Sequence, residues 1–249
     1  MIQIILTLAV IGGGLFYAIK MNRTRAATMG PAIRAFLERT GYRYPDVADP
    51  NLDAHVARCE LGWANMSKGF QSRMVRTFQG VPIHHVQEGK VTDRGWSTSC
   101  AWMAPLPQRP RVRLHIADKS LSGIGKAVKE AFSNRSQSWS PLYPVKVELA
   151  DPELAQRFVC FSDGTGDVQS LLRAPGLRER LLSCVEVDLV ITDADVRFSD
   201  PFQKNLLSAM GGASGAIAAG GDVGKTLEAQ IPMHDRIAEM LVIAGRAAM

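Results

Sequence analysis

Cys100 and the neighbouring His84 and His85 are the residues whose types best suit catalysis. A thiol becomes a strong nucleophile when an imidazole takes its proton. The two histidines are adjacent in a segment of alternating pattern, so they face opposite sides of the expected strand. Cys100 with His84 or His85 therefore defines one candidate Cys–His pair. The competing interpretation, a buried thiol and an exposed imidazole, is the more common use of these residues.

A second motif, GGDVGKT at residues 220–226, resembles the end of a phosphate-binding loop. Such a loop needs Gly, four residues and then Gly-Lys-Thr, after a strand. The position five before Gly224 is Ala219, and an Ala/Gly-rich stretch precedes the motif. The backbone N–H cradle is therefore not expected, and we interpret the motif as a mobile loop. Nucleotide binding through Lys225 is kept as a lesser hypothesis.

The remaining titratable residues do not form a metal motif. The five histidines lack the close Cys or carboxylate spacing that metal sites use. Asp193, Asp195 and Asp200 are grouped, but turns recruit Asp for its local hydrogen bonds and no calcium-loop pattern surrounds these three. The sequence therefore predicts no catalytic, cofactor-binding or metal-ligating set.

Residues 2–19 form an apolar run whose only polar side chains are Gln3 and Thr7. At about 1.5 Å per residue, a helix of this length spans roughly 27 Å, close to the roughly 30 Å of a bilayer core. A cleaved signal peptide needs basic residues before its apolar run and small residues after it, and this chain has neither. We therefore expect residues 1–20 to be a retained transmembrane anchor.

The anchor also contains small residues spaced four apart, which would let a partner helix approach closely. These pairs are Ala9 with Gly13 and Gly14 with Ala18.

The excess charge of the chain lies next to the anchor. The net charge is +5, and residues 20–43 carry six basic residues and one acid, so the rest is balanced. We expect Lys20, Arg23 and Arg25 to contact anionic lipid headgroups, at about 1 kcal/mol each, and expect no nucleic-acid partner. Basic residues follow the anchor and none precedes it, which places the N-terminus outside and residues 20–249 in the cytoplasm. Four cysteines without a CxxC pair fit a reducing compartment, although an even count also permits two disulfides.

The elements expected after the anchor indicate an α+β fold. A basic neck is expected over residues 21–69, an α+β domain over 70–200 and a C-terminal helical segment over 201–249. Alternation predicts an antiparallel meander with one wet face, at residues 74–78, 81–86, 96–106 and 111–116. Further strands are expected at 145–149, 158–161, 185–191 and 196–198. Segregated helices are expected at 31–40, 52–67, 118–132, 152–157, 167–173, 176–184 and 231–249.

The segments FQGVPIHHV, APLPQRPRVRL and DPELAQRFVCFSDGTGDVQSLLRAPGLRERLL follow the anchor and basic neck in that order. In this arrangement the chain resembles uncharacterised bacterial single-pass membrane-anchored α+β proteins. The resemblance covers about residues 70–200 and departs from the pattern at Leu154 and Ala155, where an aromatic and an acid are usual. It implies no catalytic residue.

The sequence therefore predicts a bacterial inner-membrane protein with a cytoplasmic domain. Its expected role is that of a non-enzymatic accessory or assembly subunit of a larger membrane protein complex, without a cofactor. Its expected partners are the lipid bilayer and a membrane protein. The alternative is a membrane-tethered hydrolase or transferase that uses Cys100 with His84 or His85.

Overall fold

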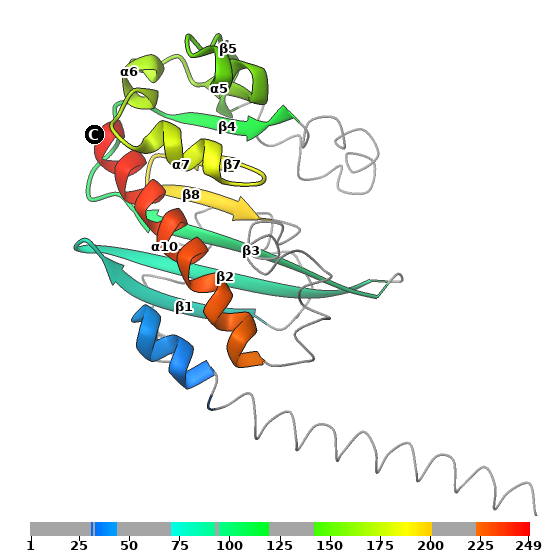
Figure 1. Ribbon diagram of the computed structural model, residues 1–249. Coiled ribbons are helices and arrows are strands. Elements are labelled where there is room, and N and C mark those ends of the chain that lie inside the picture. Colours follow the sequence, from blue (N-terminus) through cyan, green and yellow to red (C-terminus); the bar gives the residue numbers. More distant parts are fainter. Residues whose placement is uncertain (1–30, 32, 44–70, 93–94, 120–141, 201–222) are drawn as a thin grey trace, which may run out of the picture.

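The computed structural model describes residues 31, 33–43, 71–92, 95–119, 142–200 and 223–249. Within them, one antiparallel sheet carries a long helix across one face (Figure 1). The eight described strands lie in the order β1-β2-β3-β8-β7-β4-β6-β5. Their bounds are β1 Gln71–Phe78, β2 Val81–Thr92, β3 Gly95–Pro105, β4 Leu114–Asp118, β5 Val145–Val147, β6 Phe158–Ser162, β7 Asp188–Ile191 and β8 Asp195–Asp200.

Strand register places one continuous row of side chains under the long helix. Across the sheet the row reads Met74, His85, Trp102, Phe198, Leu189, Ile116, Cys160 and Val147. Side chains alternate between faces along each strand, so this row marks the face that needs cover. Apart from the thiol of Cys160, His85 carries the only ionisable side chain of the row. His85 and five other members are buried, and Met74 and Val147 are half-buried.

The opposite face of the sheet is buried at several central strands as well. The neighbouring row includes His84, Met103, Arg197 and His115, and His115 is only 1% exposed. The expectation of one wet face is therefore wrong for these strands. Period-two alternation reports which residues share a face, and it does not report whether other parts of the chain cover that face.

The long helix is α10, Val223–Ala248. Its buried side chains include Ile237, Met240, Leu241 and Ala244, which recur at the three- and four-residue spacing of a single helix face. Figure 1 shows α10 running across the strands from β1 towards β4. At its C-terminal end the carbonyl of Ala248 accepts hydrogen bonds from the backbone N–H groups of residues 111 and 112. Pro232 lies inside the helix.

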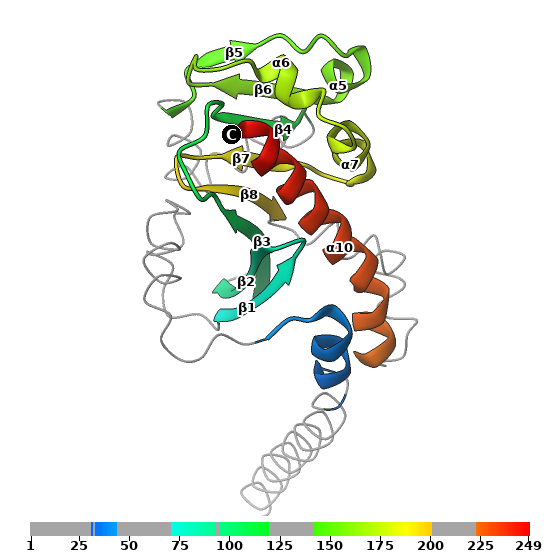
Figure 2. The same cartoon turned by 90° about the vertical axis from the view of Figure 1, so that its left-hand side faces the viewer.

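Three short helices lie beside the β4–β7 part of the sheet (Figure 2). They are α5 Pro152–Arg157, α6 Val168–Leu172 and α7 Leu177–Ser183. Asp151 caps α5 by accepting from the backbone N–H groups of Glu153 and Leu154, and Asp167 caps α6 in the same way at Ser170. Carboxylates at these positions satisfy N–H groups that have no partner inside the helix.

Residues 33–40 form a further helix that lies against the N-terminal half of α10 and near β1 (Figures 1 and 2). It ends at Gly41, whose φ of 71° lies in the left-handed region that favours glycine. The prediction of a helix stopped at Gly41 is confirmed. Arg43 then forms an antiparallel bridge with Val75 of β1.

The α+β class is confirmed, as are the β1–β2 hairpin and the helix at Asp151-Pro152. Three details are wrong. Residues 88–92 continue β2 instead of turning. β4 pairs with β6 and β7, so it does not extend the meander. Val223–Thr226 begin α10, so this part of the GKT motif is helical and is not a loop.

No described helix is both long enough and apolar enough to cross a membrane. The expected anchor at residues 1–20 and the expected helix at 52–67 lie outside the described residues, as does the expected helix at 118–132 from residue 120 on. Asp118, the first residue of that expected helix, is the last residue of β4.

Replacing Leu241 with Ala should lower the free energy of unfolding by about 2–5 kcal/mol, because it leaves a cavity beneath α10. The matched control is Leu142→Ala, the same substitution at a side chain that is 52% exposed. We expect that control to change stability by about 0.5 kcal/mol or less. Urea denaturation followed by tryptophan fluorescence measures both, and equal effects would contradict the assignment of Leu241 to the core.

Candidate functional site

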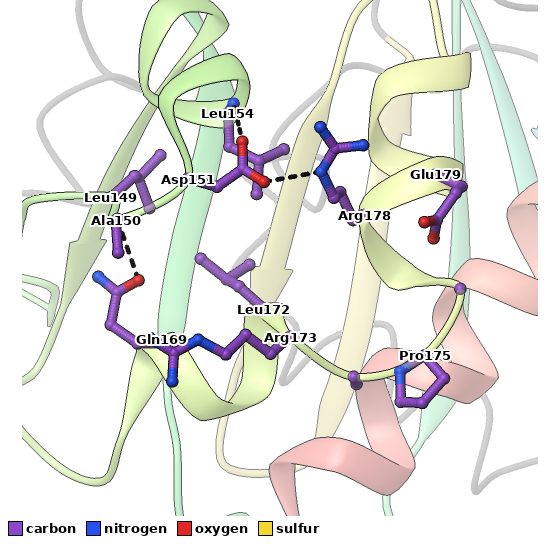
Figure 3. Close-up of a pocket in the computed structure, with 12 residues that line it drawn as sticks. Leu149, Ala150, Asp151, Leu154, Gln169, Leu172, Arg173, Pro175, Arg178 and Glu179 are labelled. Atoms are coloured by element: carbon purple, nitrogen blue, oxygen red, sulfur yellow. Dashed lines mark hydrogen bonds and ion pairs between the residues drawn. The ribbon is translucent and has the colours of Figure 1, made fainter.

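A surface pocket of about 240 Å³ lies where α5, α6 and α7 converge (Figure 3). Leu149, Leu154 and Leu172 supply apolar lining. Arg173 and Glu179 are also among its lining residues, and neither has an ion-pair partner in the described part of the chain. Opposite charges and an apolar lining make this a place where a small polar group could rest.

Asp151, one of the two carboxylates that line this pocket, already makes structural contacts. One oxygen caps α5, and the other accepts a 2.7 Å hydrogen bond from Arg178 Nε. Arg178 also pairs with Glu153. The Arg178 hydrogen bond, followed by the helix-capping bonds, lowers the pKa of Asp151. A carboxylate held ionised in this way joins α5 to α7 and is poorly suited to act as a general acid.

Gln169 makes a second structural contact beside the pocket. Its side-chain oxygen accepts from the backbone N–H of Ala150 at 3.2 Å, and its nitrogen donates to the carbonyl of Glu148. The amide thus fastens α6 to the chain that leaves β5, as Figure 3 shows for Ala150. Asp151, Arg178 and Gln169 thus hold α5, α6 and α7 in place, and they do not form a proton-transfer pair.

A second cluster lies buried where residues 33–43 meet α10 and the β1–β3 strands. We call it the joint cluster, and it consists of Tyr42, Arg76, His85, Trp102 and His234. All five residues are buried, each with at most 4% of its surface exposed. It brings together residues that are up to 192 positions apart.

Arg76 connects the three structural parts that form the joint cluster. Its guanidinium donates to Asp235 Oδ1 at 2.6 Å and to the carbonyl of His234 at 2.8 Å, both on α10. It also donates to the carbonyl of Thr40 at 3.4 Å and lies over the Tyr42 ring, 4.9 Å from the centroid. The Arg76 side chain is 3% exposed. A buried cation needs this many partners because its desolvation is costly.

The two imidazoles of the joint cluster differ in their hydrogen bonding. His234 Nδ1 accepts from Trp102 Nε1 at 3.1 Å and lies 3.3 Å from the Tyr42 hydroxyl. The ring of His85 packs against the rings of Trp102 and His234. The distances between ring centroids are 4.7 Å to Trp102 and 5.1 Å to His234. Neither ring nitrogen of His85 has a hydrogen-bond partner in the described chain. Such a group is rare, because buried polar atoms are nearly always paired.

Burial keeps both imidazoles neutral. It lowers the pKa of His85 to about 3, with a further contribution from the positive charge of Arg76. Burial also lowers the pKa of His234, aided by His85 and Arg76. Because Nδ1 of His234 accepts the indole hydrogen bond, its proton lies on Nε2. Both side chains are therefore uncharged at neutral pH.

The structure places only one of the two candidate histidines on the face of Cys100. His84 faces away from Cys100, since the pairings His85↔Trp102 and His84↔Met103 put only His85 on the face of Cys100. Cys100 Sγ donates to the carbonyl of Asp200 at 3.6 Å. Burial, and then the charge of Asp200, raises the pKa of the Cys100 thiol well above its usual value. Burial therefore favours the neutral thiol of Cys100 and the neutral imidazole of His85. An activated Cys–His pair instead consists of a thiolate and an imidazolium.

The grouped aspartates behave as turn and ion-pair residues. Asp193 accepts from Arg113 at 2.7 Å and from Arg109 at 3.2 Å. The carbonyl of Asp195 accepts from the N–H of Thr192 at 2.9 Å and closes the β7–β8 turn. Asp200 is buried at the end of β8. Among the described residues, no three His, Cys, Asp or Glu side chains are placed to hold a metal ion.

The residues expected to contact a partner helix and lipid lie outside the described part of the chain. These are Ala9, Gly13, Gly14, Ala18, Lys20, Arg23 and Arg25.

Sequence reasoning missed the joint cluster, although a signal was present. Arg76 alternates with Met74 and Phe78, so a charged residue occupies the apolar face of β1. His234 falls on the same helix face as Ile237 and Leu241. A polar residue inside an apolar period marks a buried polar contact. The partners of Arg76 and His234 are distant in sequence, and periodicity gives no information about which residues they are.

Comparison of the chain with protein-family models, curated proteins and solved structures gives no match. The site is therefore interpreted from its own geometry.

Replacing His85 with Leu should leave stability unchanged or increase it at pH 7.5, because no hydrogen bond is lost and a buried polar group is removed. Replacing His234 with Leu should cost about 1–3 kcal/mol, because Trp102 Nε1 then lacks an acceptor. The two variants control for each other, since both put the same side chain into one cluster. Urea denaturation measures the difference, and a larger loss for His85→Leu would contradict the assigned hydrogen bonding.

Cys100, Cys160 and Cys184 should resist alkylation in the native protein at pH 8. All three are buried, and burial raises the pKa of Cys160 to about 12 and that of Cys184 to about 11. Thiolates are the reactive form. Iodoacetamide treatment with and without urea, followed by peptide mapping, tests this. Rapid native labelling of Cys100 would restore the nucleophile hypothesis.

Proposed function

We propose that this protein is a single-pass membrane-anchored accessory or assembly subunit that acts by binding within a larger membrane protein complex. Residues 1–20 form its anchor in the bacterial inner membrane, with the N-terminus outside and the folded domain in the cytoplasm. Lys20, Arg23 and Arg25 contact anionic headgroups, and the Ala9/Gly13 and Gly14/Ala18 pairs face a partner helix.

The observation that carries this proposal is the docking of residues 33–43 onto the folded domain. Phe36 and Tyr42 are buried, 5% and 3% exposed. Arg76 and His234 contact the same segment from β1 and α10. Because this segment follows the expected anchor along the chain, its docking restrains where the domain sits relative to the bilayer. A subunit that must present a surface at a fixed place benefits from such a restraint.

The state of the candidate nucleophile also supports a binding role. The thiol of Cys100 is kept protonated and hydrogen-bonded to a backbone carbonyl, and Asp151 is engaged by Arg178 and the α5 cap. Each of these groups is used for packing or for holding elements together.

The sheet also offers a surface suited to protein contact. β5 is the last strand of the described sheet, and the edge of a sheet presents backbone groups that can pair with another chain. Leu142 and Val145 are exposed there, 52% and 46%. Exposed large apolar residues next to a sheet edge are typical of interaction sites.

Extraction in a mild detergent followed by size-exclusion chromatography and mass spectrometry of co-eluting proteins tests the proposal. We expect the chain to elute with a membrane protein, well above the size of a monomer in its micelle. Gly14→Leu should weaken the association, because a bulky side chain prevents close helix approach. Val10→Leu, which keeps a large apolar residue in the same segment, is the matched control. A solitary monomer that retains its fold would overturn the proposal.

A further inference from the structure

We propose that residues 33–43 form a pH-sensitive latch, which detaches from α10 and β1 as a unit and does so more readily in acid. The proposal goes beyond the proposed function, since the latch needs no partner protein. It concerns the joint cluster, whose two imidazoles lie beneath the segment that detaches.

The contact that holds the latch is small compared with the core. Its buried apolar part consists of Phe36 and Tyr42, whose rings stack with centroids 6.2 Å apart. Among the described residues, backbone pairing between the latch and the rest of the fold consists of the two 2.9 Å hydrogen bonds between Arg43 and Val75. Segments with few buried contacts open at a lower free energy than the core they cover.

The ion pair on the outside of the latch adds little to this contact. Arg39 pairs with Glu228 of α10, but the two side chains are 60% and 57% exposed. Exposed pairs contribute at most about 1 kcal/mol and are screened by salt.

The closed latch keeps an unsatisfied imidazole buried. Tyr42 packs 6.2 Å from the His85 ring and 5.4 Å from the His234 ring. When residues 33–43 leave, Tyr42 leaves with them, and this side of the cluster opens to water. The nitrogens of His85 then gain hydrogen bonds that they lack in the closed state, so the burial of His85 favours opening.

The charged groups around the two imidazoles oppose protonation in the closed state. Arg76 on β1 faces both rings and is paired with Asp235 of α10. The phenol of Tyr42 stays neutral, because burial raises its pKa to about 12. The indole of Trp102 on β3 donates to His234 and carries no charge. A proton is therefore accepted much more easily when the latch is open.

The direction of the pH effect follows from proton linkage. The pKa of His85 is about 3 in the closed state, and an imidazole in water has a pKa of about 6.5. Above about pH 6.5 both states are neutral, and the opening equilibrium is constant. Below it the open state binds protons that the closed state does not, so closure is lost progressively as the pH falls. Well below pH 6.5, each exposed histidine raises the open population about tenfold per pH unit.

Hydrogen exchange of the full chain in detergent micelles, followed by mass spectrometry between pH 7.5 and 5.5, tests the latch. Rates are corrected for the intrinsic pH dependence of exchange. We expect the amides of residues 37–43 to be less protected than those of β8 at every pH. Their protection should fall by roughly tenfold per exposed histidine between pH 7.5 and pH 5.5, with most of the fall below pH 6.5. His85→Leu should raise their protection at pH 7.5 and make the pH dependence shallower.

His84→Leu is the matched control, because it changes the adjacent histidine on the opposite face of β2. It should keep the pH dependence of the original chain. Equal protection of residues 37–43 and β8 at all pH values would overturn the proposal. So would a corrected protection that does not change with pH, or a full pH dependence in His85→Leu. The measurement uses the isolated chain, so it succeeds or fails independently of whether a partner subunit exists.

Discussion

The apolar face of the sheet must be covered, and α10 covers it. The row from Met74 to Val147 crosses all eight described strands, and leaving that many large side chains in water would cost about 25 cal/mol per Å². α10 supplies the opposing surface with side chains at helical spacing. The folded domain therefore depends on contacts between residues that are far apart in sequence. The segment 33–43 docks onto the same helix, so the position of α10 fixes both the core and the joint.

The local features of this fold were predictable because their causes are local. The β1–β2 hairpin follows from alternation around Gln79-Gly80, and α5 follows from an Asp cap before Pro. The strand order was not predictable. β8 lies between β3 and β7, a pairing across about a hundred residues that no turn signal records. The length of β2 was missed because its outer half is polar, which resembles a turn when burial is unknown.

The candidate site shows the same division. The opposite orientation of His84 and His85 was predictable, since it needs only the period of a strand. The environment of Cys100 was not, because it depends on burial and on Asp200 from a distant strand. Arg76 and His234 are polar residues within apolar periods, a signal that the sequence analysis did not use, and the meeting of β1, α10 and residues 33–43 is a tertiary property. For the joint cluster, polar residues on apolar faces carry more information than the catalytic motifs do.

Pro232 makes α10 easier to bend at one point along its length. Proline has no N–H to donate, so the carbonyl of Glu228 has no helical donor four residues later. The break in the hydrogen-bond ladder falls two residues before His234, where the helix meets the joint cluster. The part after it is fastened to the sheet by buried side chains, and the part before it pairs with Arg39. The helix therefore bends most easily at Pro232. The part after Pro232 stays packed on the sheet, and the part before it can move together with residues 33–43.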